Sequence, residues 1–269
     1  MTSDELTSED CIITWLHPVA PLLSPKGFEH QRIIEQREMR EIVFQRLARV
    51  VFLYHNDPAL FRSDLEALDF PGLAQALDQR PTSQKVRMGN FGEILASEYL
   101  RIVRGYEIPI FRLRYNPNRE TSMHGDDVIA FKFGEPDGSS REIVVGESKA
   151  RQQFTSEAVK NGYEQLIASS RRPHPVSLAF IYQVLAGAGQ IEKAAAVREY
   201  LNSFAPHPPR KRWLLFVVTG SQHPDPFGTL DTISDPLENL IAVDVSIEGL
   251  NDWVTRLFEQ EVTAYAIND

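Results

Sequence analysis

The chain has 269 residues, 42% of them hydrophobic, and a formal net charge of −9 at pH 7. This length and composition fit one large globular domain, or one domain with an appended helical piece, and the negative charge argues against a general electrostatic grip on nucleic acid. A single cysteine excludes an intrachain disulfide framework, and because neither a secretory leader nor a long apolar run is found, we expect a soluble, cytoplasmic protein.

The first 84 residues predict an N-terminal arm and a helical extension. Residues 1–29 combine three prolines with scattered polar side chains and predict an irregular arm. Residues 30–55 carry apolar residues at helical spacing with Arg and Glu between them, which predicts one long amphipathic helix. That helix either caps the core or docks to a partner. Short helices are expected around 64–68 and 72–79, before a loop at 80–85.

Residues 85–269 predict a single α/β domain in which helices cover a mixed sheet. A helix is expected from Gly89, followed by three strand candidates and then by helices, two buried strands and a closing helix. The second and third strand candidates form a hairpin across a turn rich in Asp, Gly and Ser. The expected strands cover 107–115, 127–133, 142–150, 212–220 and 239–246, and the later helices cover 155–172, 175–189, 191–204 and 250–262. A partial strand is the alternative for 175–189.

Acidic side chains and a lysine gather at the hairpin. Because side chains alternate along a strand, Glu147 and Lys149 share one face of the third strand candidate. Asp126 and Asp127 stand where the second strand begins, so a hairpin brings Asp127 and Glu147 to the same end of adjacent strands. Glu93, near the beginning of the preceding helix, could supply a third carboxylate.

Carboxylates that converge without cysteine or a histidine pair favour Mg²⁺ or Mn²⁺ over zinc. Such a metal site suits phosphodiester hydrolysis, in which a nearby lysine positions the attacking water or stabilises the developing charge. A lysine exposed at a strand end contributes little to stability, so Lys149→Ala is expected to abolish cleavage without unfolding the chain.

These residues resemble the motif of the PD-(D/E)xK nuclease superfamily, whose core is a helix, three strands, a helix and a further strand. The matching positions are Glu93, Asp127, Glu147 and Lys149. The motif's proline is missing, since the sequence reads HGDD, and only the acid carries over. Gln165 lies where many such nucleases carry an accessory glutamine. The resemblance implies a restriction-endonuclease-like core and a metal held by Glu93, Asp127 and Glu147.

A longer match, through VRMGNFGEILASEYL, IPIFRLRYNPNRETSMHGDDVIAFKF and VVGESKAR, resembles the HamA family of nuclease subunits of Hachiman anti-phage defence. It runs from about residue 85 onward in the order of elements. The resemblance implies a DNA nuclease that is restrained by a superfamily 2 helicase, HamB, encoded nearby, and that is released when damaged or phage DNA engages the helicase. An acidic nuclease without a motor fits a dependence on such a partner.

Ordinary structural readings stand beside these assignments. Glu-Ser-Lys alone could be a solvent-facing strand end, and Glu93 could complete a capping box with Asn90 as N-cap. Asp126 could be a loop acid outside the metal site. His124 could touch phosphate or could only be hydrogen-bonded in its loop, and Gln165 could be an accessory residue or a polar residue on a helix surface.

A strip of basic residues around the proposed site could follow a DNA backbone. The basic cluster at 209–213 reads instead as a solvated turn before a strand. Two other functions remain open: a subunit that keeps the nuclease fold but mainly regulates a helicase, and a stand-alone restriction-type endonuclease. The residues of the expected strip are Arg112, Arg114, Arg119, Arg151 and Lys160.

Overall fold

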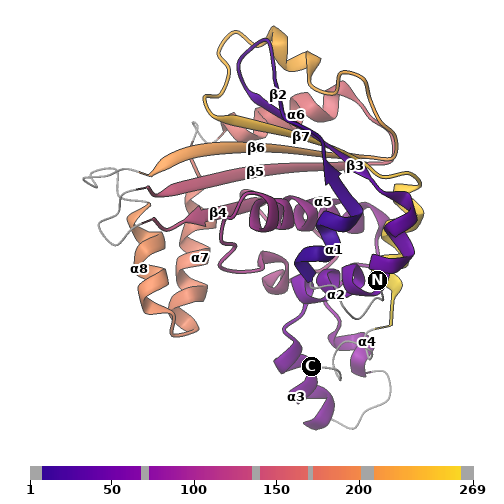
Figure 1. Ribbon diagram of the computed structural model, residues 1–269. Coiled ribbons are helices and arrows are strands. Elements are labelled where there is room, and N and C mark those ends of the chain that lie inside the picture. Colours follow the sequence, from indigo (N-terminus) through magenta and orange to yellow (C-terminus); the bar gives the residue numbers. More distant parts are fainter. Residues whose placement is uncertain (1–7, 68–72, 135–139, 169–171, 201–208, 262–269) are drawn as a thin grey trace.

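The computed structural model describes residues 8–67, 73–134, 140–168, 172–200 and 209–261. At its centre lies a seven-stranded sheet of order β1-β3-β7-β6-β5-β4, in which β2 also pairs with β3 (Figure 1). The strands are β1 (Leu16–Pro18), β2 (Leu22–Leu23), β3 (Glu29–Glu35), β4 (Val128–Lys132), β5 (Glu142–Arg151), β6 (Arg210–Thr219) and β7 (Leu240–Ser246).

The sheet is mixed, as the sequence predicts. Strands β3, β7, β6 and β5 run parallel, whereas β4 pairs antiparallel with β5 and β1 pairs antiparallel with β3. Parallel neighbours need crossover connections, and three helices separate β5 from β6 along the chain. The antiparallel β4–β5 pair confirms the expected hairpin, although its turn at 135–139 lies outside the described residues.

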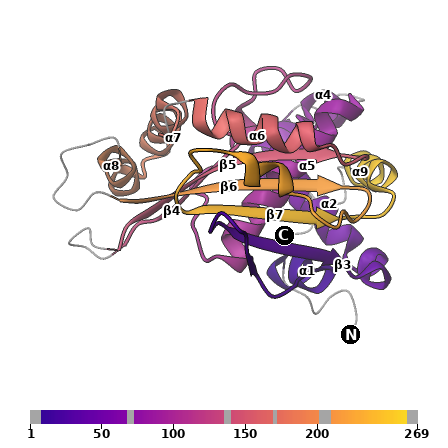
Figure 2. The same ribbon diagram turned by 90° about the horizontal axis from the view of Figure 1, so that it is seen from above.

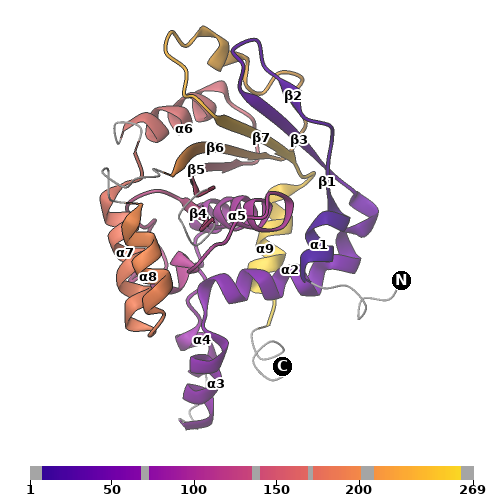
Figure 3. The same cartoon turned by 60° about the vertical axis from the view of Figure 1, so that its left-hand side comes forward.

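Helices cover both faces of the sheet. The helices α2, α5 and α9 lie on one face and α6 lies on the other, while α7 and α8 stand side by side next to β4 (Figures 1, 2 and 3). The short helices α3 and α4 project from the body of the molecule. The helices are α1 (Ser8–Trp15), α2 (Arg40–His55), α3 (Pro58–Ala67), α4 (Leu73–Leu77), α5 (Gln84–Glu98), α6 (Ser156–Ala168), α7 (Pro175–Gly187), α8 (Ile191–Glu199) and α9 (Leu250–Glu259).

Alternation along the central strands builds two hydrophobic layers. Val144 of β5 packs in the cluster that contains residues of α5, α2 and α9, whereas its neighbour Val145 packs in the cluster that contains residues of α6. A third cluster joins Ile129 of β4 to Leu178 and Ile181 of α7. Burial on both faces explains why β6, β7 and the first half of β5 consist mainly of apolar residues.

The N-terminal prediction is wrong in two respects. Within the described residues, 8–29 form α1, β1, β2 and the start of β3 rather than an irregular arm, and 30–35 continue β3 rather than a long helix, which begins only at Arg40. The period-two pattern of β3 is hidden because one of its buried side chains is polar: Gln31 donates hydrogen bonds to the carbonyls of Val19 and Arg32. The division of the chain into an N-terminal extension (1–84) and a nuclease domain (85–269) stays a prediction. Strand β3 comes from the first part but pairs with β7 of the second.

Two further segments differ from the prediction. Residues 107–115 form no strand: Glu107 makes an isolated bridge to Phe131, and a 3₁₀ turn covers Arg112–Tyr115. Pro109 lacks the N–H group that a ladder needs. The helix expected from Gly89 begins at Gln84. The helix expected at 175–189 is confirmed by α7, and its partial-strand alternative is wrong. Among the described residues, no helix combines the length and apolar character that a bilayer crossing requires.

Candidate active site

The β4–β5 hairpin brings two acidic residues together. Val128 pairs with Gly146, so the residues next to them, Asp127 and Glu147, lie at the same end of adjacent strands. Oδ2 of Asp127 accepts a hydrogen bond of 2.9 Å from the backbone N–H of Ser148. This bond fixes the Asp127 carboxylate beside β5, just beyond the last backbone pair of the hairpin.

Lys149 follows on the same face of β5 as Glu147. Its Nζ atom lies 2.5 Å from Oε1 of Glu147 and donates a second hydrogen bond to Oε1 of Gln165 on α6. Gln165, the predicted accessory residue, therefore contacts Lys149 directly. The aliphatic part of Lys149 lies against Gly162 of α6, and the side chain is only 18% exposed. The expectation of a freely exposed lysine is wrong.

Glu93 projects toward these residues from the middle of α5. Because α5 begins at Gln84, the capping-box reading of Asn90 and Glu93 is wrong. Asn90 is buried and its Nδ2 atom donates to Nε2 of His55, 2.9 Å away. Glu93 lines both the cleft described below and a small cavity of about 20 Å³ behind it.

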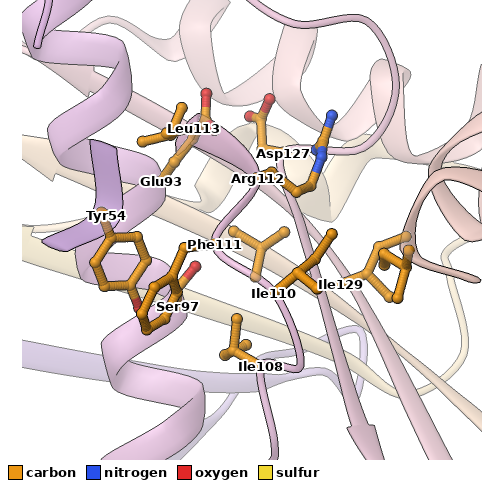
Figure 4. A pocket seen from close by; sticks show the side chains of 12 residues that line it. Tyr54, Glu93, Ser97, Ile108, Ile110, Phe111, Arg112, Leu113, Asp127 and Ile129 are labelled. Carbon is orange, nitrogen blue, oxygen red and sulfur yellow. The ribbon is translucent and has the colours of Figure 1, made fainter. Parts of the chain in front are cut away.

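The small cavity has a polar end and an apolar end. In Figure 4, Glu93, Asp127 and Arg112 gather at one end, and Phe111 and Ile108 lie toward the other. A volume of about 20 Å³ is enough for a single water molecule. Glu93 and Asp127 thus line this small cavity as well as the cleft.

Negative charge is crowded at this site. Burial, together with the charge of Asp127, raises the pKa of Glu147 to about 8, although Lys149 acts in the opposite direction. Burial and then Asp127 also raise the pKa of Glu93 well above its usual range, and Arg112 only partly opposes this shift. Burial is the larger cause for both residues, and repulsion from Asp127 adds to it; a divalent ion bound between these carboxylates would favour their ionised forms.

The donor chemistry fits a hard cation. The available ligands are carboxylate oxygens, and Mg²⁺ is commonly held by one or two carboxylates together with water and substrate phosphate. Asp127 and Glu147 form such a pair. Within the described ranges, no three His, Cys, Asp or Glu side chains lie close enough together to hold a metal ion. Glu93 therefore stands near the pair without completing a ligand triad.

A cleft of about 1190 Å³ opens over these residues. The first turn of α5, the loop before β4, the end of β5 and α6 contribute to its walls. Lys85 and Arg151 add positive charge to its lining beside Lys149, and Glu120 adds a further acid. The predicted site residues that line it are Glu93, His124, Asp127, Glu147, Lys149, Arg151 and Gln165.

Asp126 does not line this cleft with its neighbour. Its Oδ2 atom accepts a 2.8 Å hydrogen bond from the backbone N–H of His174, and its own backbone N–H donates to Oγ of Ser177 at 3.0 Å. Burial raises the pKa of Asp126, although hydrogen bonds from His174 and Ser177 act against this. The structure thus directs Asp126 toward α7.

The five basic residues of the expected strip are in different surroundings. Arg151 is exposed in the cleft, and Lys160 is exposed on α6. Arg112 donates to the carbonyl of His124 at 3.1 Å. Arg114 and Arg119 donate to backbone carbonyl groups of the protein itself. Only part of the strip therefore faces the cleft.

Sequence reasoning missed the small residues that let the helices approach β5. A Cβ atom on Gly162 would lie 2.7 Å from Cδ1 of Leu215 and 3.3 Å from Cγ of Lys149, and one on Gly92 would lie 2.5 Å from Oγ of Ser148. A glycine inside a helical pattern often has such a packing reason, and this was the available signal. Nothing in the sequence pattern indicated the roles of His174 and Ser177.

Comparison with known proteins gives two matches. The model of the HamA family matches residues 29–248. The Hachiman protein HamA of Bacillus cereus is 39% identical over 128 residues, which are 48% of this chain and 44% of that protein. The aligned region thus spans less than half the length of this relative.

Proposed function

The chain belongs to the HamA family, and from this premise we propose that it is a metal-dependent deoxyribonuclease of the PD-(D/E)xK type. The family match begins at residue 29, at the start of β3, and so includes the strand that pairs with β7. We assign the unit of α5, β4, β5, α6 and β6 to the restriction-endonuclease-like class. The hairpin and the helix and strand that follow it support this assignment, although the unit has two strands before α6 where the superfamily core has three.

One relationship carries the proposal. Asp127 and Glu147 stand side by side at the end of a buried hairpin, and Lys149 contacts Glu147 within the same cleft. Two acids and a lysine that share one cleft suit phosphodiester hydrolysis better than a structural role. A purely structural group would be stabilised by full charge balance, whereas this one leaves Glu147 with a pKa of about 8.

Asp127 and Glu147 would hold Mg²⁺ or Mn²⁺, with Glu93 as a nearby third acid. Such an ion, when bound, neutralises the nonbridging phosphate oxygens and lowers the pKa of water. The protein's own contribution is positional: the Ser148 N–H fixes Asp127, and Gln165 and Glu147 hold the ammonium group of Lys149. An oriented ammonium group places a positive charge where the phosphate negative charge develops.

We further propose that the chain acts in Hachiman anti-phage defence beside a HamB-like superfamily 2 helicase. The similarity to the Hachiman protein of Bacillus cereus supports this role. The charge of −9 supports a dependence on a partner, because little nonspecific DNA affinity is expected from such a chain. The first 84 residues, with the projecting helices α3 and α4, offer a region where that partner could dock.

The test uses the purified chain, alone and with its helicase neighbour, on plasmid and linear DNA in Mg²⁺, Mn²⁺ or EDTA. We expect degradation that needs the metal, that Glu147→Gln and Lys149→Ala abolish, and that the helicase suppresses until it engages DNA. Equal cleavage by wild type and both variants at matched purity would refute the nuclease assignment. Sequence-specific cleavage that ignores the neighbour would favour a stand-alone restriction-type enzyme.

One observation favours a second candidate. Glu147 and Gln165 satisfy the ammonium group of Lys149 within the protein, so this group could instead be structural in a chain that keeps the nuclease fold and mainly regulates the helicase. That role predicts tight helicase binding, no response to divalent ions and no effect of changing the acids. The same experiment separates the two functions, since a regulatory subunit binds its partner but never cuts DNA under any metal condition.

A further inference from the structure

The turn that delivers Asp127 to the site is held from outside its own strand. The carbonyl of His124 accepts a hydrogen bond from Arg112, and the backbone N–H of Asp126 donates to Ser177. Two of the three residues before Asp127 are therefore hydrogen-bonded to segments distant in sequence. Asp127 directly follows this turn and precedes the first residue of β4, so these contacts help to set its backbone position, while the Ser148 N–H holds its carboxylate.

Gly125, between these two residues, makes a close approach to α7. It has a φ of +106°, which favours glycine, and a Cβ atom at this position would lie 2.4 Å from Oγ of Ser177. The backbone of the turn thus lies directly against the Ser177 hydroxyl. No larger side chain fits at this position without moving either the turn or the helix.

Ser177, on the α7 side of this contact, is buried. Ser177 is 1% exposed and lies in the first turn of α7, which His174 caps through a hydrogen bond from the Val176 N–H to its Nδ1 atom. The N–H of His174 in turn donates to the Asp126 carboxylate. Leu178, the next residue of α7, packs with Ile129 of β4 in one hydrophobic cluster. The helix is therefore anchored to the strand independently of the turn.

We infer that Ser177 and Asp126 are positioning residues, which fix the turn before β4 against the N-terminal end of α7 and so set the Asp127 carboxylate for metal binding. This inference rests on the proposed function. It assigns Asp126, next to the metal-binding acid in sequence, to an anchoring role, because its carboxylate accepts the His174 N–H on the α7 side. Partners that orient a ligand commonly contribute 10-fold to 100-fold to metal affinity.

The experiment measures Mn²⁺ binding to the full chain by electron paramagnetic resonance, without DNA, for Ser177→Ala and a matched control. The control is Tyr200→Phe, which removes a hydrogen bond of 2.8 Å between the end of the same helical hairpin and the Lys132 carbonyl at the far end of β4. We expect Ser177→Ala to weaken Mn²⁺ binding by about 10-fold and Tyr200→Phe to leave it within about twofold of wild type.

A second pair of variants tests the anchor from the other side. Asp126→Asn keeps an oxygen that can accept the His174 N–H, so we expect Mn²⁺ affinity within about threefold of wild type, whereas Asp126→Ala should lose about 10-fold. If Ser177→Ala and Tyr200→Phe bind Mn²⁺ equally well, the inference is overturned. It is also overturned if Asp126→Asn loses binding as completely as Glu147→Gln, because Asp126 would then be a ligand.

Failure of this inference can be told from failure of the proposed function. Suppose that wild type binds Mn²⁺, that Glu147→Gln does not, and that the Ser177 and Asp126 variants bind it as wild type does. The metal site would then be supported, and the positioning role of Ser177 and Asp126 would be refuted. If wild type binds no Mn²⁺ at all, both fall. Thermal unfolding of each variant shows whether a weakened site reflects a chain that has lost its fold.

Discussion

The Nζ atom of Lys149 lies 2.5 Å from Oε1 of Glu147, two residues earlier on the same face of β5. This contact gives both residues a second task. The lysine is the cation that keeps a buried carboxylate partly ionised, while the carboxylate and Gln165 hold the lysine in one orientation. Removing Lys149 therefore affects both the chemistry of the site and its stability.

Replacing Lys149 by alanine should reduce DNA cleavage by at least about 100-fold, because an oriented positive charge in the active site is lost. Since a buried acceptor is left without its partner, the free energy of unfolding should also fall by about 1 to 3 kcal/mol. Plasmid cleavage and urea unfolding measure the two effects. Lys211→Ala, at an exposed position near the opposite end of the sheet, should change neither.

Gly162 controls how closely α6 lies against the lysine. A methyl group there would meet Leu215 at 2.7 Å and the Lys149 side chain at 3.3 Å, so Gly162→Ala should push α6 away from β5 and separate Gln165 from Lys149. We expect a loss of about 1 to 3 kcal/mol in stability and a larger proportional loss of cleavage. Gly187→Ala serves as the control, because the added Cβ atom would meet no neighbouring side chain or distant backbone atom within 4 Å. Equal activity of both variants would contradict this role.

The sequence predicts the chemistry of the site better than its surroundings. Alternation along β5 is enough to place Glu147 and Lys149 on one face, and hairpin pairing is enough to add Asp127. Both are local rules. The contact between Lys149 and Gln165 instead depends on how α6 packs on the sheet, and the orientation of Asp126 depends on α7. Tertiary packing decides these, so spacing alone does not reveal them.

The same distinction explains the fold. Strands β5, β6 and β7 are buried on both faces, and each contains a run of apolar residues that identifies it as a strand in the sequence. Strand β3 lies in the same sheet, but its buried Gln31 and partly buried Arg32 depend on partners from other segments, including Asp244 of β7. A polar residue satisfied by a distant partner breaks the hydrophobic pattern, and the segment then resembles the helix that follows it.

Two arginines that the sequence treats alike should behave differently toward DNA. Arg151 is exposed in the cleft, so Arg151→Ala should weaken DNA binding and reduce the salt dependence of affinity by about one counterion. Arg114 donates to the Leu53 carbonyl at 2.6 Å and lies over the ring of Phe111, so Arg114→Ala should lower stability and leave the salt dependence unchanged. Fluorescence anisotropy at several salt concentrations measures both. A reduced slope for Arg114→Ala would place that residue on the DNA.

His55 should make the stability of the protein depend on pH. Its Nδ1–H donates to the Val51 carbonyl at 2.8 Å, and its Nε2 accepts from Asn90, so the neutral ring is fully hydrogen-bonded inside the protein. Burial lowers the pKa of His55 from 6.5 to about 4. Between pH 6.5 and pH 4, His55 binds a proton in the unfolded chain but stays neutral in the folded protein. The free energy of unfolding therefore decreases as the pH falls from 6.5 toward 4.

The expected loss from this one group approaches about 3 kcal/mol by pH 4, and urea unfolding between pH 7 and pH 4 would measure it. His55→Gln should lower stability at pH 7 but flatten this part of the pH profile. An unchanged slope in His55→Gln would mean that other groups set the acid sensitivity.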